Sequence, residues 1–434
     1  MAPPQLARAA RAVSRVALLS SEPVRPRMAG IGIRYLELAR RLPETGHETV
    51  LISPASREES AAAGLDPAAV RPFGSAPLAG LVADCDAAVA QGQLANDLLL
   101  ASPALPVAID LYDPWLVENL HYTATLGLDP YRNDHATWVL QMSRGDFFLC
   151  SSEEQRQFYL GFLAALGRVN PERIAADPDL RGLVDTVPFG LPAALPAHRA
   201  VLAERRPGER RLLFGGLYDW YDPFTLLSAL ERLEGVDWSL WLVRNPNPEG
   251  TPQRLFSEVE ADCRRRGWWE GRVRVLDWLA AERRWDLLRD VDLLVAPHLP
   301  SLETRLALRT RFLEALAVGC PVVASEGGAL GRMVAERQAG WVVPCGDAAA
   351  LAAALCEALG GGPAVEARRA RGRELAMLFS WERALAPLVR FLARPLPDPT
   401  KERYAFRVPT AAPADRLAFR ARRWLARRWR ERSA

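Results

Sequence analysis

The polar side chains best placed for chemistry lie in the stretch HLPSLETRLALRTRFLEALAVGCPVVAS, residues 298–325. Before an expected helix that ends at Gly319, this stretch carries Glu303, Arg305, Arg309, Thr310 and Arg311. Guanidinium groups bind phosphate oxygens in pairs, and the backbone N–H groups of a helix start add further donors. The pattern predicts a diphosphate site, with Glu314 accepting hydrogen bonds from ribose hydroxyls. The alternative is a row of exposed ion pairs along the helix.

Two pairs of glycines follow other expected strands. Gly30 and Gly32 lie at the start of a helix, and Gly215 and Gly216 follow the strand RLLF. Glycine lets backbone N–H groups approach a bound anion, although glycines before a helix also serve as plain turns. The pattern GxGxxG is not completed, because Tyr35 holds its last position, and this disfavours an ordinary NAD-binding fold.

These loops follow the strands of two similar halves. The expected strands are apolar runs at 15–20, 48–53, 86–91, 105–111, 146–151 and 184–190, then at 211–217, 238–243, 272–279, 291–297 and 320–325. Apolar runs that alternate with helical patterns indicate parallel sheets covered on both faces, with ligands beyond the carboxyl ends of the strands. We predict an α/β fold of two doubly wound, Rossmann-like lobes facing a central cleft, followed by a basic helical tail.

The breaks between these patterns suggest the domain boundaries. A proline-bearing stretch near 191–211 separates a first domain at 1–195 from a second at 208–376. An amphipathic helix is expected at 377–395, and a linker and basic amphipathic tail at 396–434.

The arginine-rich helix start, the run LEALAVGCPVVAS and the GG turn that follows it resemble the donor-site signature of retaining, family-four glycosyltransferases of the GT-B fold. The likeness continues in VALLSSEPVRPRMAGIGIRYLELARRLPETGHE and in QAGWVVPCGDAAALAAAL, and so extends over residues 15–392. It implies that the first domain faces the acceptor, that the second binds a nucleotide-sugar, and that the helix at 377–395 crosses back. By position, Glu314 resembles the family's ribose-binding glutamate, and Glu303 the glutamate that contacts the donor sugar.

The sequence departs from this family in two places. Ten residues separate Glu303 from Glu314 where seven are usual, and Leu306 occupies the standard position. The arginine and lysine that usually clamp the diphosphate are also missing, since the segment FGGLYDWYDPF has Gly216 and Tyr221 near those positions. An unneutralised diphosphate is costly in a closed cleft. We therefore expect Arg305, Arg309 and Arg311 to supply the positive charge.

Two carboxylates in IDLYDPW are candidates in the first domain. Asp110 and Asp113 could bind sugar hydroxyls or stabilise positive charge at the anomeric carbon, or they could simply form an Asp-Pro turn. Asp113, Glu303 and Arg309 are the predicted catalytic residues. The nearby His121 and His135 are expected to be structural.

Composition excludes several other classes of function. The six cysteines form no CxxC pair and the five histidines show no metal-binding spacing, so neither a metal nor any cofactor besides the nucleotide-sugar co-substrate is predicted. Three DxD triplets, including Asp290 and Asp292, are interpreted as incidental. The apolar run at 16–19 is too short for a signal peptide, and no run approaches the roughly 20 residues of a membrane span.

These observations predict a cytoplasmic protein with a basic tail. Residues 415–434 hold eight arginines and two acids. The tail would suit the anionic inner face of a membrane, whereas a nucleic-acid partner is not expected because no nucleic-acid-binding motif accompanies it.

The predicted function is a glycosyltransferase that moves a sugar, with retention and without metal, to a glycan, lipid-linked or small-molecule acceptor. The alternatives are a GT-B coupling enzyme with altered chemistry and a non-catalytic two-lobed binding protein.

Overall fold

The computed structural model describes residues 14–244 and 254–405, and its strands fall into two groups. Those of the first lobe are β1 (Arg15–Leu19), β2 (Glu48–Ser53), β3 (Val70–Pro72), β4 (Ala87–Ala90), β5 (Val107–Asp110), β6 (Phe147–Cys150) and β7 (Val184–Thr186). Those of the second are β8 (Arg210–Phe214), β9 (Trp238–Val243), β10 (Val273–Leu276), β11 (Leu293–Ala296), β12 (Val322–Ser325) and β13 (Trp341–Val343). Every expected strand is present. Strands β3 and β13, which have only three residues each, were not predicted from the sequence.

Helices alternate with these strands. In the first lobe they are α1 (Gly30–Arg41), α2 (Arg57–Ala62), α3 (Leu78–Leu81), α4 (Gly92–Ala101), α5 (Trp115–Asn119), α6 (Thr123–Leu126), α7 (Asp129–Arg144), α8 (Glu153–Ala165) and α9 (Pro171–Ala176). The later helices are α10 (Pro223–Leu230), α11 (Arg254–Arg265), α12 (Arg284–Asp290), α13 (Leu302–Leu306), α14 (Thr310–Val318), α15 (Gly328–Glu336), α16 (Ala348–Gly360), α17 (Pro363–Ala376) and α18 (Trp381–Ala393).

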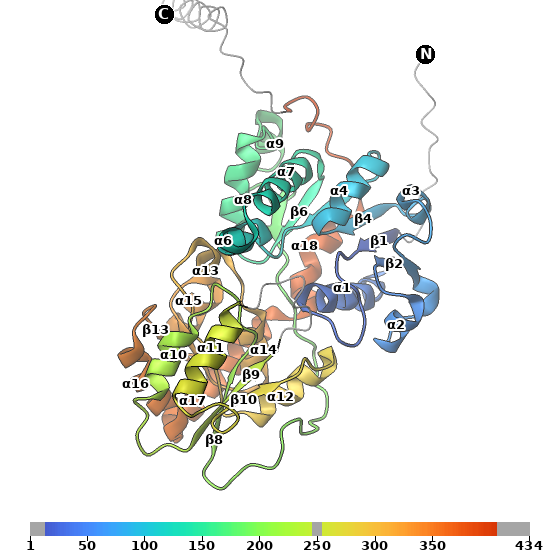
Figure 1. The fold of residues 1–434 in the computed structure, drawn as a ribbon. Coiled ribbons are helices and arrows are strands. Elements are labelled where there is room, and N and C mark those ends of the chain that lie inside the picture. Colours follow the sequence, from blue (N-terminus) through green and yellow to red (C-terminus); the bar gives the residue numbers. More distant parts are fainter. Residues whose placement is uncertain (1–13, 245–253, 406–434) are drawn as a thin grey trace, which may run out of the picture.

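Each lobe is built on a parallel sheet, as Figure 1 shows. The strand orders are β3-β2-β1-β4-β5-β6-β7 and β10-β9-β8-β11-β12-β13, with strand one of each lobe near the middle. Most of these strands are buried almost throughout, because helices cover both faces. The predicted fold class is confirmed for the two lobes, while the predicted basic tail (residues 406–434) lies outside the described residues.

Local signals explain where the helices of the second lobe begin and end. The Asp222 carboxylate accepts a hydrogen bond from the Thr225 amide at 3.0 Å, so it caps the start of α10. Gly319 ends α14 with a φ of 76°, a left-handed conformation that favours glycine. These two signals fix where α10 begins and where α14 ends.

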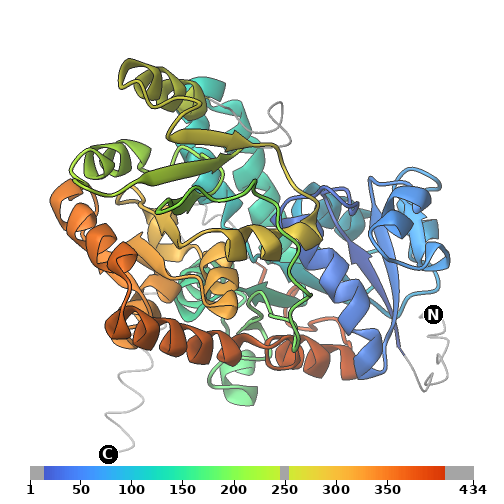
Figure 2. The same ribbon diagram turned by 90° about the horizontal axis from the view of Figure 1, so that it is seen from below.

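Helix α18 returns the chain to the first lobe. Figure 2 shows α17 and α18 following one another along one side of the molecule, from the second lobe to the first. The rings of Phe391 and Phe147 stack with centroids 5.2 Å apart. A Cβ on Gly190 would lie 2.3 Å from the ring of Trp381, so the helix start packs directly against the backbone after β7.

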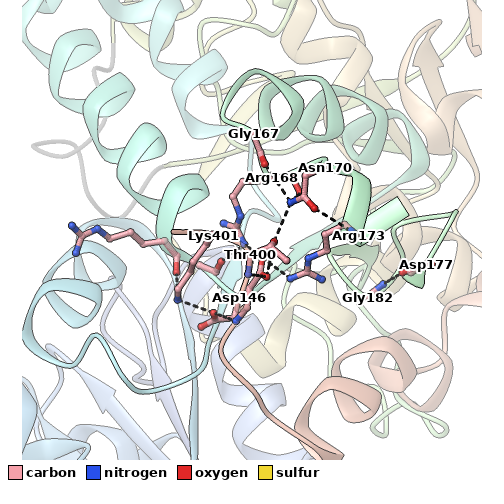
Figure 3. A network of polar contacts seen from close by, with 12 residues as sticks. Asp146, Gly167, Arg168, Asn170, Arg173, Asp177, Gly182, Thr400 and Lys401 are labelled. Carbon is pink, nitrogen blue, oxygen red and sulfur yellow. Dashed lines mark hydrogen bonds and ion pairs between the residues drawn. The ribbon is translucent and has the colours of Figure 1, made fainter. Parts of the chain in front are cut away.

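The segment after α18 is held against the first lobe by a buried polar network (Figure 3). The Asp398 carboxylate accepts hydrogen bonds from Arg168 at 2.7 Å and forms a salt bridge with Arg173 at 2.6 Å. The Asp398 backbone amide donates a hydrogen bond to the Asp146 carboxylate at 2.7 Å. The Lys401 ammonium lies 2.8 Å from this Asp146 carboxylate. The stretch expected to act as a linker is therefore fixed in place up to this point.

No single helix in the described ranges is long and apolar enough to cross a membrane. Helices α16 and α17, together with the short turn that follows α17, reach the length and apolar composition of a membrane span only when they are counted as one segment. That segment is bent by 95° between the two helices.

Asp398→Asn should destabilise the protein, because it leaves the buried Arg168 guanidinium without its counter-charge. We expect the free energy of unfolding to fall by about 3 kcal/mol, as when one partner of a buried ion pair is removed. Urea unfolding followed by tryptophan fluorescence measures this change. Asp129→Asn, which removes a carboxylate that is 92% exposed, is the matched control and should have little effect.

Asp398→Asn should also change how steeply the free energy of unfolding falls at low pH. Burial alone would raise the pKa of Asp398, but hydrogen bonds from Arg173, the Thr400 amide and Arg168 outweigh it and hold the pKa to about 2. The Asp398 carboxylate therefore adds to the free energy of unfolding above its ordinary pKa of about 3.9, and this stabilisation is lost as the pH falls towards 2. If the free energy of unfolding fell as steeply at low pH in Asp398→Asn as in the wild type, this role of Asp398 would be contradicted.

Candidate active site

A cleft of about 600 Å³ lies between the lobes, lined by the loops that follow the carboxyl ends of the strands. The first lobe contributes the loop from β1 to α1 and the loop from β5 to α5. The second contributes the loop after β8, the residues around 278–284, and the start of α14. This is the edge at which open parallel sheets bind their ligands.

The structure brings most of the predicted site residues to this cleft. Those that line it are Gly30, Asp113, Gly215, Arg309, Thr310, Arg311 and Glu314. Those that do not are Gly32, Gly216, Glu303 and Arg305. The contacts of each explain the difference.

Glu303 lies beneath the surface of the cleft as the partner of Arg309. Its side chain is fully buried and accepts two hydrogen bonds from the Arg309 guanidinium, at 2.6 and 2.7 Å. The guanidinium also lies 5.9 Å from the ring centroid of Tyr221. The charge of Arg309 is therefore already balanced within the protein.

The three arginines of this segment diverge. Arg305 is exposed on α13 and does not line the cleft, whereas Arg311 does. Arg311 forms no salt bridge with any residue that the structure describes. Of the three, Arg311 thus carries the positive charge available to a ligand.

Gly215 makes room for Arg311. A Cβ at position 215 would lie 1.4 Å from the Arg311 Nη1 atom, so any side chain there would displace the guanidinium. This packing was not expected from the sequence, which predicted that the glycine admits backbone amides to a ligand. At Gly216 a Cβ would meet the ring of Tyr218 at 3.2 Å.

Glu314 is oriented by an arginine that the sequence analysis missed. The Arg284 Nε atom donates to the Glu314 carboxylate, and both residues line the cleft. Arg284 also packs on Trp285, 4.6 Å from its ring centroid. Because Arg284 comes from α12, 30 residues earlier in the chain, no local pattern pointed to it.

The start of α1 is occupied by a carboxylate of the chain itself. The Gly32 amide donates to Glu22 at 3.2 Å, and a Cβ on Gly32 would lie 2.9 Å from the Cβ of Met28. Burial raises the pKa of Glu22. Gly32 therefore serves close packing, and only Gly30 faces the cleft.

Asp110 and Asp113 have different surroundings. Asp110 is buried and accepts two hydrogen bonds from Arg34, at 2.7 and 3.1 Å, so it is not free to bind a sugar. This corrects one of the two sequence-based candidates. Asp113 lines the cleft, where burial, with added repulsion from Glu22 and Asp110, raises its pKa to about 7.

A second carboxylate stands near Asp113. Glu118, on α5, lines the cleft, and burial together with the charge of Asp113 raises its pKa well above the usual range. Neither carboxylate has a hydrogen-bond or salt-bridge partner in the described part of the chain. Glu118 was missed because nothing in the sequence distinguishes it from an exposed helical glutamate.

Aromatic residues occupy the loop after β8, where the usual cationic clamp is missing. The rings of Tyr218 and Trp220 stack with centroids 4.9 Å apart and planes 4° apart. Trp220 meets Tyr122 and His121 of the first lobe with centroids 6.1 and 6.0 Å apart. The lobes therefore touch through aromatic rings at this end of the cleft.

Hydrogen bonds join the lobes elsewhere. The Tyr112 hydroxyl and the Thr310 hydroxyl share a hydrogen bond. The Trp278 indole donates to the Met28 carbonyl at 3.1 Å, and the Ala281 amide donates to the Pro26 carbonyl at 2.8 Å. Across residues 14–244 and 254–405, no group of three or more His, Cys, Asp or Glu side chains is arranged to hold a metal ion.

Comparison with known proteins agrees with this geometry. Residues 209–360 match the family described as Glycosyl transferases group 1. A stretch of 187 residues is 33% identical to a phosphatidyl-myo-inositol mannosyltransferase of Mycobacterium leprae (strain TN). That stretch covers 42% of this chain and 46% of the relative, so the chain matches about half of the relative's length.

Two solved structures share the whole two-lobed arrangement. Sucrose-phosphate synthase from Thermosynechococcus elongatus superposes with a TM-score of 0.62 at 16% identity, over 88% of this chain and 98% of its own. HepE from Anabaena, solved in complex with UDP-glucose, gives 0.62 at 16% identity, over 88% and 99%. Residues 209–360 therefore match the family described as Glycosyl transferases group 1, and the chain shares the two-lobed fold of these solved structures, in agreement with the class that the sequence resemblance predicted.

Arg309→Ala should destabilise the protein, because it leaves the buried Glu303 carboxylate without a partner. We expect the free energy of unfolding to fall by about 3–5 kcal/mol, measured by urea unfolding. The double variant Glu303→Gln/Arg309→Ala should recover part of that loss, since no charge is then buried alone. Arg305→Ala, at an exposed position in the same segment, is the control; equal stability of Arg309→Ala and Arg305→Ala would contradict the ion pair.

Proposed function

We propose that the protein transfers a sugar from a nucleoside-diphosphate sugar to an acceptor bound in the cleft, with retention of configuration and without a metal ion. One observation carries this proposal: Arg311 lines the cleft at the start of α14, with no salt-bridge partner among the described residues. A cation and the free amides of a helix start both favour an anion such as a diphosphate. The family match and the fold likeness to HepE, which was solved with UDP-glucose, support the same donor.

In the proposed reaction, negative charge grows on the leaving diphosphate as the bond to the anomeric carbon breaks. Arg311 and the amides at the start of α14 stabilise this charge without a metal, which is the main electrostatic contribution to catalysis. Arg309 and Glu303 position the loop that carries Thr310 and Arg311. Gly30 lets the start of α1 approach the donor from the opposite lobe.

The remaining residues have proposed roles in holding the substrates. Glu314, oriented by Arg284, accepts hydrogen bonds from the ribose hydroxyls. Asp113 lies in the first lobe, where a carboxylate stabilises the positive charge that develops at the anomeric carbon. The first lobe, proposed to span residues 1–195, holds the acceptor, which is a glycan, a lipid-linked sugar or a small molecule; the second, residues 208–376, holds the donor.

Arg311→Ala should weaken binding of UDP or GDP at least about tenfold, because a hydrogen bond to a charged group contributes about 1.5–3 kcal/mol. The melting temperature without nucleotide should not change, since Arg311 has no salt bridge to lose. Isothermal titration and nucleotide-dependent melting shifts measure the two effects.

Two variants sharpen this test. Gly215→Ala should reproduce the loss of affinity, because its Cβ would displace the Arg311 guanidinium. Arg305→Ala removes an exposed arginine of the same segment and should bind nucleotide normally. Unchanged affinity in Arg311→Ala would overturn the proposed diphosphate site.

A further inference from the structure

Two carboxyl groups line one part of the cleft, which is called its acidic end below. Asp113 and Glu118 line it without any hydrogen-bond or salt-bridge partner in the described ranges. Two unpaired and largely buried carboxylates destabilise a folded protein. Such a cost is typical of groups retained for a ligand that is not yet bound.

The nearby arginines cannot serve as partners for an anionic ligand at this end. Arg309, whose charge acts on Glu118, is held by two hydrogen bonds to Glu303. Arg34, whose charge acts on Asp113, is held by two hydrogen bonds to Asp110. Both guanidinium groups are therefore neutralised by buried carboxylates.

Two other arginines of the cleft lining are exposed. Arg25 and Arg27 belong to the loop between β1 and α1. In that loop the Pro26 and Met28 carbonyls accept hydrogen bonds from Ala281 and Trp278 of the second lobe. The acidic end instead meets the second lobe where Tyr122 contacts Trp220.

The wall opposite the carboxylates is aromatic and has an unused hydrogen-bond donor. Trp220, which is 8% exposed, stacks on Tyr218, and both residues line the cleft. The Trp220 indole Nε1 atom has no hydrogen-bond partner within the described residues. Ring faces suit the C–H surface of a sugar, while an indole N–H and carboxylate oxygens suit its hydroxyls.

We infer that this end of the cleft binds the acceptor and selects a polyhydroxy acceptor that is neutral or carries an amino group, against one bearing phosphate or carboxylate there. This inference rests on the proposed transfer reaction. A hydroxyl group can hydrogen-bond to Asp113 and Glu118 in either protonation state, and an ammonium group favours their ionised forms. An anionic group would instead favour the protonated forms and would find Arg34 and Arg309 already paired.

Matched acceptor probes test the inference. Methyl glucoside, glucosamine, glucose 6-phosphate and glucuronate are compared by saturation-transfer NMR and by nucleoside-diphosphate release, each with the intact protein and UDP or UDP-glucose. We expect the neutral and amino probes to bind at least about tenfold more tightly than the two anionic probes. Equal or tighter binding of glucose 6-phosphate would overturn the inference.

Variants of the two carboxylates connect the selectivity to these residues. Glu118→Gln and Asp113→Asn should narrow the difference in affinity between glucosamine and glucose 6-phosphate by at least about threefold, because an amide cannot ionise to pair with the ammonium group. Their melting temperatures should stay equal or rise, since a buried carboxyl group without a partner is lost. The control Asp129→Asn, on the exposed face of α7, should keep the full selectivity of the wild type.

The remaining outcomes separate this inference from the proposed function. If UDP raises the melting temperature but no sugar probe binds, the acceptor pocket is refuted while the donor site stands. If neither UDP nor GDP binds, the proposed function itself fails. If both Glu118→Gln and Asp113→Asn leave the difference in affinity between the sugar probes and glucose 6-phosphate unchanged, these carboxylates do not determine which acceptor charge the site selects.

Discussion

The guanidinium of Arg34 and the carboxylate of Asp110 meet at 2.7 and 3.1 Å, with both side chains fully buried. The same guanidinium donates to the Val187 carbonyl and lies 4.6 Å from the ring centroid of Tyr112. It thus ties α1 to the ends of β5 and β7. Tyr112 connects this ion pair to the second lobe, because the Tyr112 hydroxyl shares a hydrogen bond with Thr310 at the start of α14.

Two ion pairs orient charged side chains at the cleft. Glu303 holds Arg309 and Arg284 holds Glu314, so two functional side chains on the second lobe are fixed before any ligand arrives. Arg311, Asp113 and Glu118 line the cleft without a salt-bridge partner in the described ranges. Since unpaired charge in a cleft costs stability, these three are the groups on which the proposals depend.

Sequence periodicity was enough to predict both sheets apart from the three-residue strands β3 and β13, since each longer buried strand is an apolar run and α10 and α14 have local end signals. The site could be predicted only in part, because its pairings connect distant segments: Tyr112 and Thr310 are 198 residues apart. Arg305 and Arg309 are close in the sequence and were predicted to act together, but α13 ends between them and their side chains lie in different surroundings. Arg305 is exposed on that short helix, while Arg309 follows it and turns back to the buried Glu303.

The position of Arg311 explains how the second lobe provides a cation without the usual clamp after β8. Its guanidinium reaches from α14 to Gly215, so the charge lies beside the loop after β8 although that loop does not supply it. The loop is therefore free to carry Tyr218 and Trp220, which form the aromatic wall facing the first lobe. Gly215 and Arg311 form one unit, because any side chain at 215 would displace the cation. The contact between Gly215 and Arg311 thus places a cation beside a loop whose own side chains are aromatic.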